Sequence, residues 1–136
     1  MEQLLADTGF LVAIGRGSDP RHDGALRFSD QFEGQLVTAS PVIVEACHFL
    51  NPQSRLDLLE SVGGGRLAVV EVPVQSYPDL AATIRKYANR DIDFADASLV
   101  WLAEQTGLRG ILTVDIADFS ILRIKGSRRF ELINWT

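Results

Sequence analysis

The chain has little of several residues on which whole classes of function depend. It contains one cysteine, Cys47, and two histidines among 136 residues. A single cysteine excludes an internal disulfide and favours a reducing compartment. Two histidines argue against a zinc site, and no grouping of serine, histidine and acid indicates a hydrolytic triad. The chemistry of this chain therefore has to come from other side chains.

Long hydrophobic runs are also missing. No stretch approaches the roughly 18 apolar residues that a membrane span needs. The N-terminal sequence MEQLLADTGF lacks the basic region and the apolar core of a signal peptide. We therefore expect a cytoplasmic protein that makes no use of a membrane.

An excess of positive charge is absent as well. The 13 basic and 18 acidic residues give a net charge of −5, whereas nucleic-acid binders usually carry a basic footprint. If four of the acids converge on one site, however, the rest of the chain is close to neutral. Basic residues also cluster late in the chain, at Arg123, Lys125, Arg128 and Arg129. The overall charge therefore does not exclude an RNA substrate.

The hydrophobic pattern predicts an α/β protein. Hydrophobic residues make up 46% of the chain, which is enough for one domain with its own core, residues 1–136. Short apolar strand patterns alternate with helical patterns, and the strands are expected at residues 4–6, 36–39, 67–72, 111–114 and 130–133. Ser40, directly before Pro41, is expected to cap a helix with its hydroxyl. This alternation predicts a three-layer α/β/α sandwich with a central parallel sheet.

Two acids follow predicted strands directly. Asp7 comes after residues 4–6, and Asp115 comes after residues 111–114. The carboxyl ends of parallel strands meet at one edge of the sheet, where ligands bind. Each residue could instead be a helix N-cap, a role in which aspartate stabilises a helix by about 1 kcal/mol. For either residue alone, both interpretations stay open.

Two further acids lie in apolar helical segments. Glu45 is surrounded by hydrophobic residues in PVIVEACHFL, and a buried, unpaired glutamate costs several kcal/mol. It therefore needs a cation or a strong donor, and an ion pair with an arginine is the alternative. Asp96 lies in FADASLV at the start of a helix for which Asp93 is the expected cap. Both acids suit the helix dipole, but the apolar surroundings favour Asp96 as a site residue.

Taken together, these carboxylates predict a metal site. Two carboxylates 4 Å apart repel each other by about 4 kcal/mol at an effective dielectric constant of 20. A group of four therefore requires a counter-charge. Ligands that offer only oxygen suit hard cations such as Mg²⁺ or Mn²⁺, which activate water and hold phosphodiesters.

Four segments in this order resemble the PIN domain, most closely that of VapC-type ribonuclease toxins from toxin–antitoxin pairs. They are Asp7-Thr8, Glu45, DFADASLV and LTVDIADF. The resemblance implies an endoribonuclease that depends on Mg²⁺ or Mn²⁺ and cleaves RNA with a metal-activated water. It implies four catalytic and metal-binding acids, Asp7, Glu45, Asp96 and Asp115, with less defined roles for Thr113 and Asp118. Asp93, the expected cap, is a further candidate for the same site. It also implies a homodimer and a small cognate antitoxin.

Two other interpretations were weighed. A PIN-fold module that binds RNA or protein without cleaving it would keep the same acids. An aspartyl-phosphate receiver domain also gathers acids at a sheet edge, but it needs an acid pair after the first strand and a lysine near the last one. Asp7 has no acidic neighbour, and Arg128 and Arg129 precede the last strand. If the chain cleaves RNA, the segment from Arg123 to Arg129 is a candidate to guide the RNA backbone.

Overall fold

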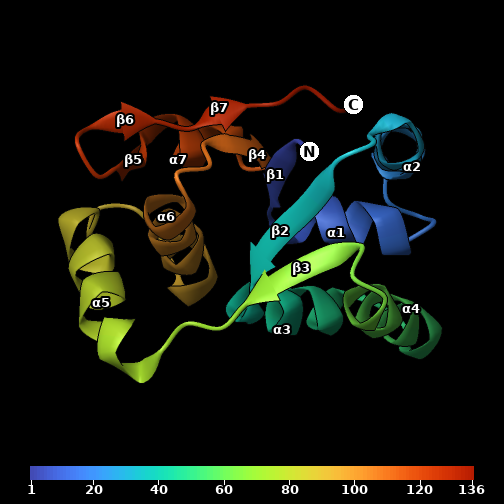
Figure 1. Ribbon diagram of the computed structural model, residues 1–136, viewed down its shortest axis with the longest axis horizontal. Helices are drawn as coiled ribbons and strands as arrows, with labels where there is room; N and C mark the ends of the chain where they lie inside the picture. Colours follow the sequence, from blue (N-terminus) through green and yellow to red (C-terminus); the bar gives the residue numbers. More distant parts are fainter.

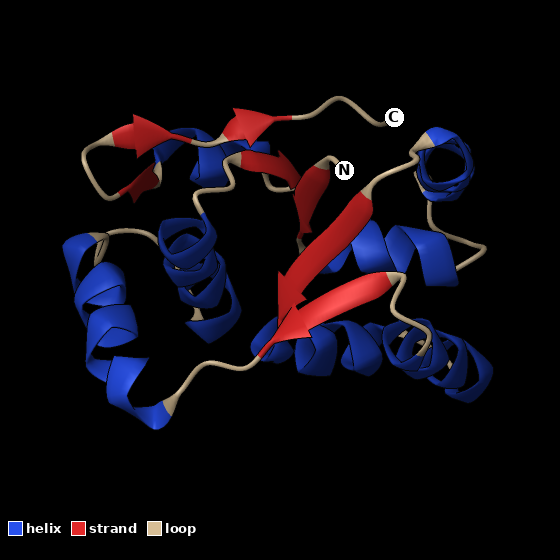
Figure 2. Ribbon diagram, viewed as in Figure 1, coloured by secondary structure: helices blue, strands red, loops and turns tan.

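The computed structural model describes all 136 residues, whose helices and strands are drawn in Figures 1 and 2. The strands are β1 (Gln3–Ala6), β2 (Gln35–Ala39), β3 (Leu67–Val70), β4 (Gly110–Leu112), β5 (Arg123–Ile124), β6 (Arg128–Arg129) and β7 (Glu131–Leu132). The helices are α1 (Thr8–Gly15), α2 (His22–Gln31), α3 (Ser40–Phe49), α4 (Pro52–Gly63), α5 (Tyr77–Lys86), α6 (Phe94–Thr106) and α7 (Ile116–Ile121), with a short 3-10 turn η1 (Val74–Ser76) before α5. None of the helices is both long and apolar enough to cross a membrane.

Five strands form one sheet in the order β3-β2-β1-β4-β7, and every neighbouring pair is parallel. In Figure 1, α5 and α6 lie to the left of β1, β2 and β3, and α1, α3 and α4 lie below and to the right of these strands. The predicted α/β/α arrangement with a central parallel sheet is therefore confirmed. The first strand, β1, lies at the centre between β2 and β4, so the ends of these three strands lie side by side.

The core explains why these short segments become strands. Thirty-two buried hydrophobic residues form one cluster, and the strand residues Leu5, Ala6, Ile111 and Leu112 are fully buried within it. Strands covered on both faces are expected to be apolar throughout, as these are. The α6 helix is likewise buried along most of its length, from Ala95 to Ala103. The acid-bearing strand ends and the start of α6 are thus fixed by the core.

The structure corrects several local predictions. Ser40 does not cap α3: the N-cap is Ala39, and the Ser40 hydroxyl donates instead to Glu71 Oε2 at 2.9 Å. The strand predicted at residues 111–114 ends at Leu112, because Thr113 leaves the ladder to bind other residues through its hydroxyl. The antiparallel hairpin of β5 and β6 was not predicted, since each strand has only two residues.

Gly34 occupies a position where a side chain has no space. It precedes β2, and a Cβ added there would overlap the backbone carbonyl oxygen of Glu2 and the ring of Phe32. The Gly34→Ala variant is therefore expected to lose about 1–3 kcal/mol of unfolding free energy, because backbone cannot move aside as a flexible side chain can. Urea unfolding followed by circular dichroism measures this loss.

Gly17→Ala is the matched control, since nothing lies within 4 Å of a Cβ added at Gly17. An equal loss of stability in the two variants would contradict the assignment of the effect to the contact with Glu2.

Candidate functional site

A cavity of about 430 Å³ opens at the carboxyl ends of the central strands. Thirteen residues line it, of which seven are acidic and one, Arg16, is basic. The acids are Asp7, Asp19, Glu45, Asp91, Asp93, Asp96 and Asp115. The sequence predicted that Asp7, Glu45, Asp96 and Asp115 meet at this edge of the sheet, and all four line the cavity. A cavity with so large an excess of one charge favours a cation or a proton as its ligand.

Asp7 is held firmly where β1 ends. Its backbone N–H donates to the Leu112 carbonyl at 3.0 Å, which extends the pairing of β1 with β4 by one residue. The carboxylate accepts the Thr8 N–H at 2.7 Å with one oxygen and the Thr113 hydroxyl at 2.7 Å with the other. Asp7 therefore caps α1 and faces the cavity at once, so the two interpretations of this residue are compatible.

Thr113 joins the two acids that follow the strands. Besides donating to Asp7, its hydroxyl accepts the Asp115 N–H at 2.9 Å. The Thr113 carbonyl in turn accepts the Trp135 indole N–H at 3.2 Å. Thr113 is itself buried and is not part of the cavity wall. It therefore positions Asp7 and Asp115 and does not face a ligand.

The start of α6 supplies two acids that cap each other. Asp93 accepts the Asp96 N–H at 2.9 Å, and the Asp96 side chain accepts the Asp93 N–H at 3.2 Å. This capping box confirms Asp93 as the N-cap of α6. Asp93 also lines the cavity, as does Glu45 of α3. The prediction assigned Asp93 to the cap and Asp96 to the site, whereas in the structure both residues take part in the capping box and both line the cavity.

Burial gives two of these carboxyls unusual proton affinity. Loss of solvent raises the pKa of Asp7 from 3.8 to about 6, although its hydrogen bonds from Thr113 and Thr8 act in the opposite direction. Loss of solvent, together with the charge of Asp93, raises the pKa of Asp96 to about 8. The cavity therefore binds protons at a pH where ordinary carboxyls are ionised.

Glu45 and Asp93 respond in opposite directions. Burial raises the pKa of Glu45, and the neighbouring charges of Asp93 and Asp7 add to this effect. For Asp93, burial also acts to raise the pKa, but hydrogen bonds from the Asp96 N–H and from the Glu45 carboxyl lower it overall. Glu45 is therefore the more easily protonated of the two, and Asp93 the more easily ionised.

Asp118 belongs to a neighbouring ion pair. Its side chain accepts the Arg90 Nε–H at 2.8 Å, and its N–H donates to Asp115, which caps α7. Burial raises the pKa of Asp115, while the Arg90 guanidinium lowers it. Asp118 does not line the cavity. Its place is next to Asp115, where it positions Arg90.

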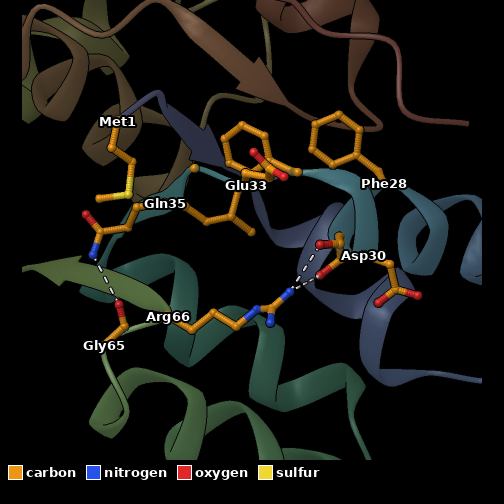
Figure 3. Close-up of a pocket in the computed structure, with 11 residues that line it drawn as sticks. Met1, Phe28, Asp30, Glu33, Gln35, Gly65 and Arg66 are labelled. Carbon is orange, nitrogen blue, oxygen red and sulfur yellow. Dashed lines mark hydrogen bonds between the residues drawn. The ribbon is translucent and has the colours of Figure 1, made fainter.

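A separate hollow of about 300 Å³ lies at the opposite edge of the sheet, where β1 and β2 begin (Figure 3). Arg66 crosses it and donates to the Ser29 carbonyl and hydroxyl, each at 3.1 Å. Gln35 donates to the Gly65 carbonyl at 3.1 Å. These bonds occupy Arg66 and Gln35 within the chain itself, and only two carboxylates, Asp30 and Glu33, line the hollow.

Comparison with known proteins assigns the chain that carries this acidic cavity to a family. The PIN domain model matches residues 4–124. The chain belongs to the PIN domain family. This PIN domain is 28% identical to ribonuclease VapC26 of Mycobacterium tuberculosis over 134 residues, 96% of the chain and 99% of the relative. The crystal structure of M. tuberculosis VapC20, described as a Sarcin-Ricin loop cleaving toxin, superposes with a TM-score of 0.73 at 19% identity, covering 79% of this chain and 86% of that one. The latter likeness shows the fold.

Two residues of the PIN domain cavity were missed by sequence reasoning. Arg16, which follows α1, is the one basic residue in the cavity wall, and nothing in its local sequence sets it apart from other surface arginines. Thr8 also lines the cavity. Its buried hydroxyl makes no hydrogen bond of ordinary geometry, but it lies close enough to the Glu45 carboxylate to lower the pKa of that group. In the sequence, Thr8 stands out only as part of the Asp7-Thr8 motif. A ligand oxygen in the cavity is one way to complete the bonding of such a hydroxyl.

The donor set of the PIN domain fits a hard cation in chemistry. Every candidate ligand is a carboxylate or hydroxyl oxygen, and the raised pKa values of Asp7 and Asp96 reflect charge that a cation would neutralise. The present arrangement contains no group of three or more acidic, histidine or cysteine side chains at metal-binding spacing. Binding a cation would therefore require rearrangement of carboxylates that now bind protons or backbone N–H groups.

Proposed function

We propose that this PIN domain is a metal-dependent endoribonuclease that hydrolyses RNA phosphodiesters, and that it is the toxin of a toxin–antitoxin pair acting in the cytoplasm. One observation carries the proposal: seven acids from separate parts of the chain line a single cavity with one basic residue. Similarity to ribonuclease VapC26 over almost the full length of both chains supports the choice of RNA as substrate.

The proposed cofactor is Mg²⁺ or Mn²⁺. Asp7, Glu45, Asp96 and Asp115 would hold it, with Asp93 able to replace one of them. When bound, such an ion supplies a hydroxide nucleophile at neutral pH and polarises the phosphodiester. These acids come from the β1–α1 connection, α3, α6 and the β4–α7 connection, so the core of the fold fixes their approach to the ion.

The chain's own groups prepare the cavity for a phosphodiester. Thr113 and the Thr8 N–H hold both oxygens of Asp7, so this carboxylate is already oriented. The Thr8 hydroxyl lies near the Glu45 carboxylate but makes no hydrogen bond of ordinary geometry, and a phosphate oxygen in the cavity would accept its hydrogen. Arg16 is exposed at the cavity wall, where its guanidinium would pair with the substrate backbone.

The proposal includes partners. We expect a homodimer and a small antitoxin that covers the acidic cavity. Large apolar side chains are exposed on neighbouring helices, at Val44 and Phe49 of α3 and at Leu56 and Leu59 of α4. Exposed apolar groups of this size support association with another chain. Light scattering on the isolated protein measures whether the chain self-associates.

A second candidate function is a PIN-fold module that binds RNA or protein without cleaving it. The absence of any three side chains at metal-binding spacing favours this alternative. The buried Thr8 hydroxyl and the raised pKa values favour the nuclease, because they mark a cavity in need of a ligand.

Calorimetry and cleavage assays on the same protein separate the two functions. The nuclease is expected to bind Mn²⁺ with heat release at millimolar or lower concentration and to cleave RNA only with Mg²⁺ or Mn²⁺ present. Chelation by EDTA should stop cleavage, and Ca²⁺ serves as the control for general ion effects. RNA binding without heat from Mn²⁺ and without cleavage would establish the binding module. Cleavage that persists in EDTA would contradict the metal-dependent mechanism.

A further inference from the structure

Positive charge is concentrated at one end of the molecule. We define the basic end as seven residues of two short segments, 85–90 and 123–129: Arg85, Lys86, Arg90, Arg123, Lys125, Arg128 and Arg129. These segments contain no acid, and they hold seven of the 13 basic residues of the chain. The rest of the chain has six basic residues against 18 acidic ones, so the molecule is strongly polarised.

The fold brings the two segments together. The first covers the C-terminal turn of α5 and the residues after it, and the second covers the β5–β6 hairpin. The Arg123 N–H donates to the Tyr87 hydroxyl at 3.0 Å, which ties the hairpin to the end of α5. Figure 1 shows the hairpin and this end of α5 at the same end of the molecule.

Most of this charge has no partner within the chain. The only salt bridge of the structure joins Arg90 to Asp118, so the other six basic side chains pair with no carboxylate. Arg123 donates to the last carbonyls of α7. Arg85, Lys125, Arg128 and Arg129 are exposed and make no side-chain hydrogen bond. They are available to an external anion.

The hairpin holds like charges opposite each other. Arg123 and Arg129 are directly paired across its two strands, an arrangement that destabilises a sheet unless an anion lies nearby. The connecting residues 125–127 form a tight turn in which Gly126 and Ser127 have φ values of 80° and 59°. Positive φ is unusual for serine. The hairpin therefore keeps its charges close together in a fixed turn.

A continuous series of contacts leads from the basic end to the acidic cavity. Asp115 of the cavity wall accepts the Asp118 N–H, and Asp118 pairs with Arg90. The Arg90 N–H donates to the Tyr87 carbonyl at 2.9 Å, and Tyr87 holds Arg123. The basic end is thus joined to the wall of the acidic cavity through these contacts.

We propose that the basic end binds the phosphate backbone of an RNA strand beyond the cleavage point, so that the protein selects long RNA over short fragments. The proposal rests on the ribonuclease function. Five of the seven residues are arginine, whose planar fork binds phosphate oxygens in pairs. An acidic protein segment is the competing occupant, and the connection to a cavity proposed to cut RNA favours the nucleic acid.

The test compares two triple variants with the same change in charge. Lys125→Gln/Arg128→Gln/Arg129→Gln removes charge from the hairpin. Arg21→Gln/Arg27→Gln/Arg109→Gln removes it from exposed positions outside both the basic end and the cavity. Binding is measured by fluorescence anisotropy in EDTA, so that cleavage plays no part, with RNAs of about 25 and about five nucleotides. Circular dichroism verifies that each variant is folded.

The hairpin variant is expected to bind the long RNA about 10–100-fold more weakly. The slope of log affinity against log salt concentration should also become shallower by about two, because each phosphate contact with a single strand contributes roughly 0.7 to that slope. Binding of the short RNA and of the control variant should stay within about twofold of the parent protein. Should the hairpin variant not fold, Arg85→Gln/Lys86→Gln on α5 tests the same surface and should also weaken binding of the long RNA.

Equal weakening in the two triple variants would overturn the proposal, as would equal weakening for the two RNA lengths. Tighter binding of a polyglutamate peptide than of RNA of equal charge would also overturn it, in favour of an acidic protein partner. The ribonuclease function is tested separately, by measuring cleavage of long RNA with Mn²⁺. If all variants cleave it at equal rates, the ribonuclease function stands, but the basic end plays no part in it.

Discussion

The Asp7→Asn variant is expected to cleave RNA at least about 100-fold more slowly than the parent protein, yet to unfold at an equal or higher urea concentration. Loss of a metal ligand should exceed the 10- to 100-fold effects that outer-shell partners have. Stability should not fall, because ionised Asp7 is buried at 5% exposure next to other carboxylates. A pKa raised from 3.8 to about 6 corresponds to about 3 kcal/mol of unfavourable free energy for the ionised form.

The Asp7→Asn variant will not keep all of the stability gained by removing the buried charge. The side-chain oxygen of asparagine can still accept the Thr8 N–H. Its NH₂ group, however, replaces the oxygen that accepts the Thr113 hydroxyl, and an NH₂ group cannot accept a hydrogen bond. The expected net change at pH 8 is therefore about 0–2 kcal/mol of added stability. Asp30→Asn, an exposed change in the hollow at the far edge of the sheet, is the matched control and should alter neither property. Cleavage at the parent rate by purified Asp7→Asn protein would refute the assignment of Asp7.

The metal-free protein should become less stable as pH rises from about 4 to 8, the reverse of the usual trend for acids. Asp7 and Asp96 have raised pKa values in the fold, near 6 and 8, and values near 3.8 when unfolded. Between these limits the folded state binds more protons than the unfolded state, so the unfolding free energy decreases with pH. Below about pH 4, Asp7 and Asp96 are protonated in both the folded and the unfolded state, and above about pH 8 they are ionised in both. Outside this range these two residues therefore cause little further change in stability.

Between pH 5 and pH 8.5 the size of the effect is about 1–2 kcal/mol from Asp7 alone, with Asp96 adding to it. Asp93, whose pKa is lowered, contributes its own dependence below pH 4 and so outside this range. Urea unfolding in EDTA at pH 5 and pH 8.5 measures the difference. The Asp7→Asn/Asp96→Asn double variant should show a much smaller one. A parent protein more stable at pH 8.5 than at pH 5 would contradict the raised pKa values.

The sequence predicted the sheet and the meeting of four acids because both follow from short-range patterns. Apolar strands covered on both faces can hardly be anything but parallel strands of an α/β protein, and residues at their carboxyl ends must share an edge. Asp7 and Asp115 were located in this way. Glu45 was located because a glutamate surrounded by apolar residues needs a partner. The catalytic roles of these residues stay predictions.

The errors arose where a distant residue decides the outcome. Ser40 has the local pattern of a helix cap, but Glu71, 31 residues away, binds its hydroxyl. The capping role of Asp93 was correct, yet nothing near it in sequence shows that Glu45, from another helix, lowers its pKa. Arg16 resembles any surface arginine until the fold places it at the cavity. The hairpin at Arg123 was missed because two-residue strands have no periodicity to detect.

The central position of β1 has a consequence for synthesis of the protein. The N-terminal strand leaves the ribosome first, but its ladder is incomplete until residues 110–112 of β4 join it. Until then Asp7 lacks the Leu112 carbonyl and the Thr113 hydroxyl that fix it, the latter 106 positions later in the chain. The nascent chain therefore cannot complete the acidic cavity until β4 and Thr113 have been synthesised.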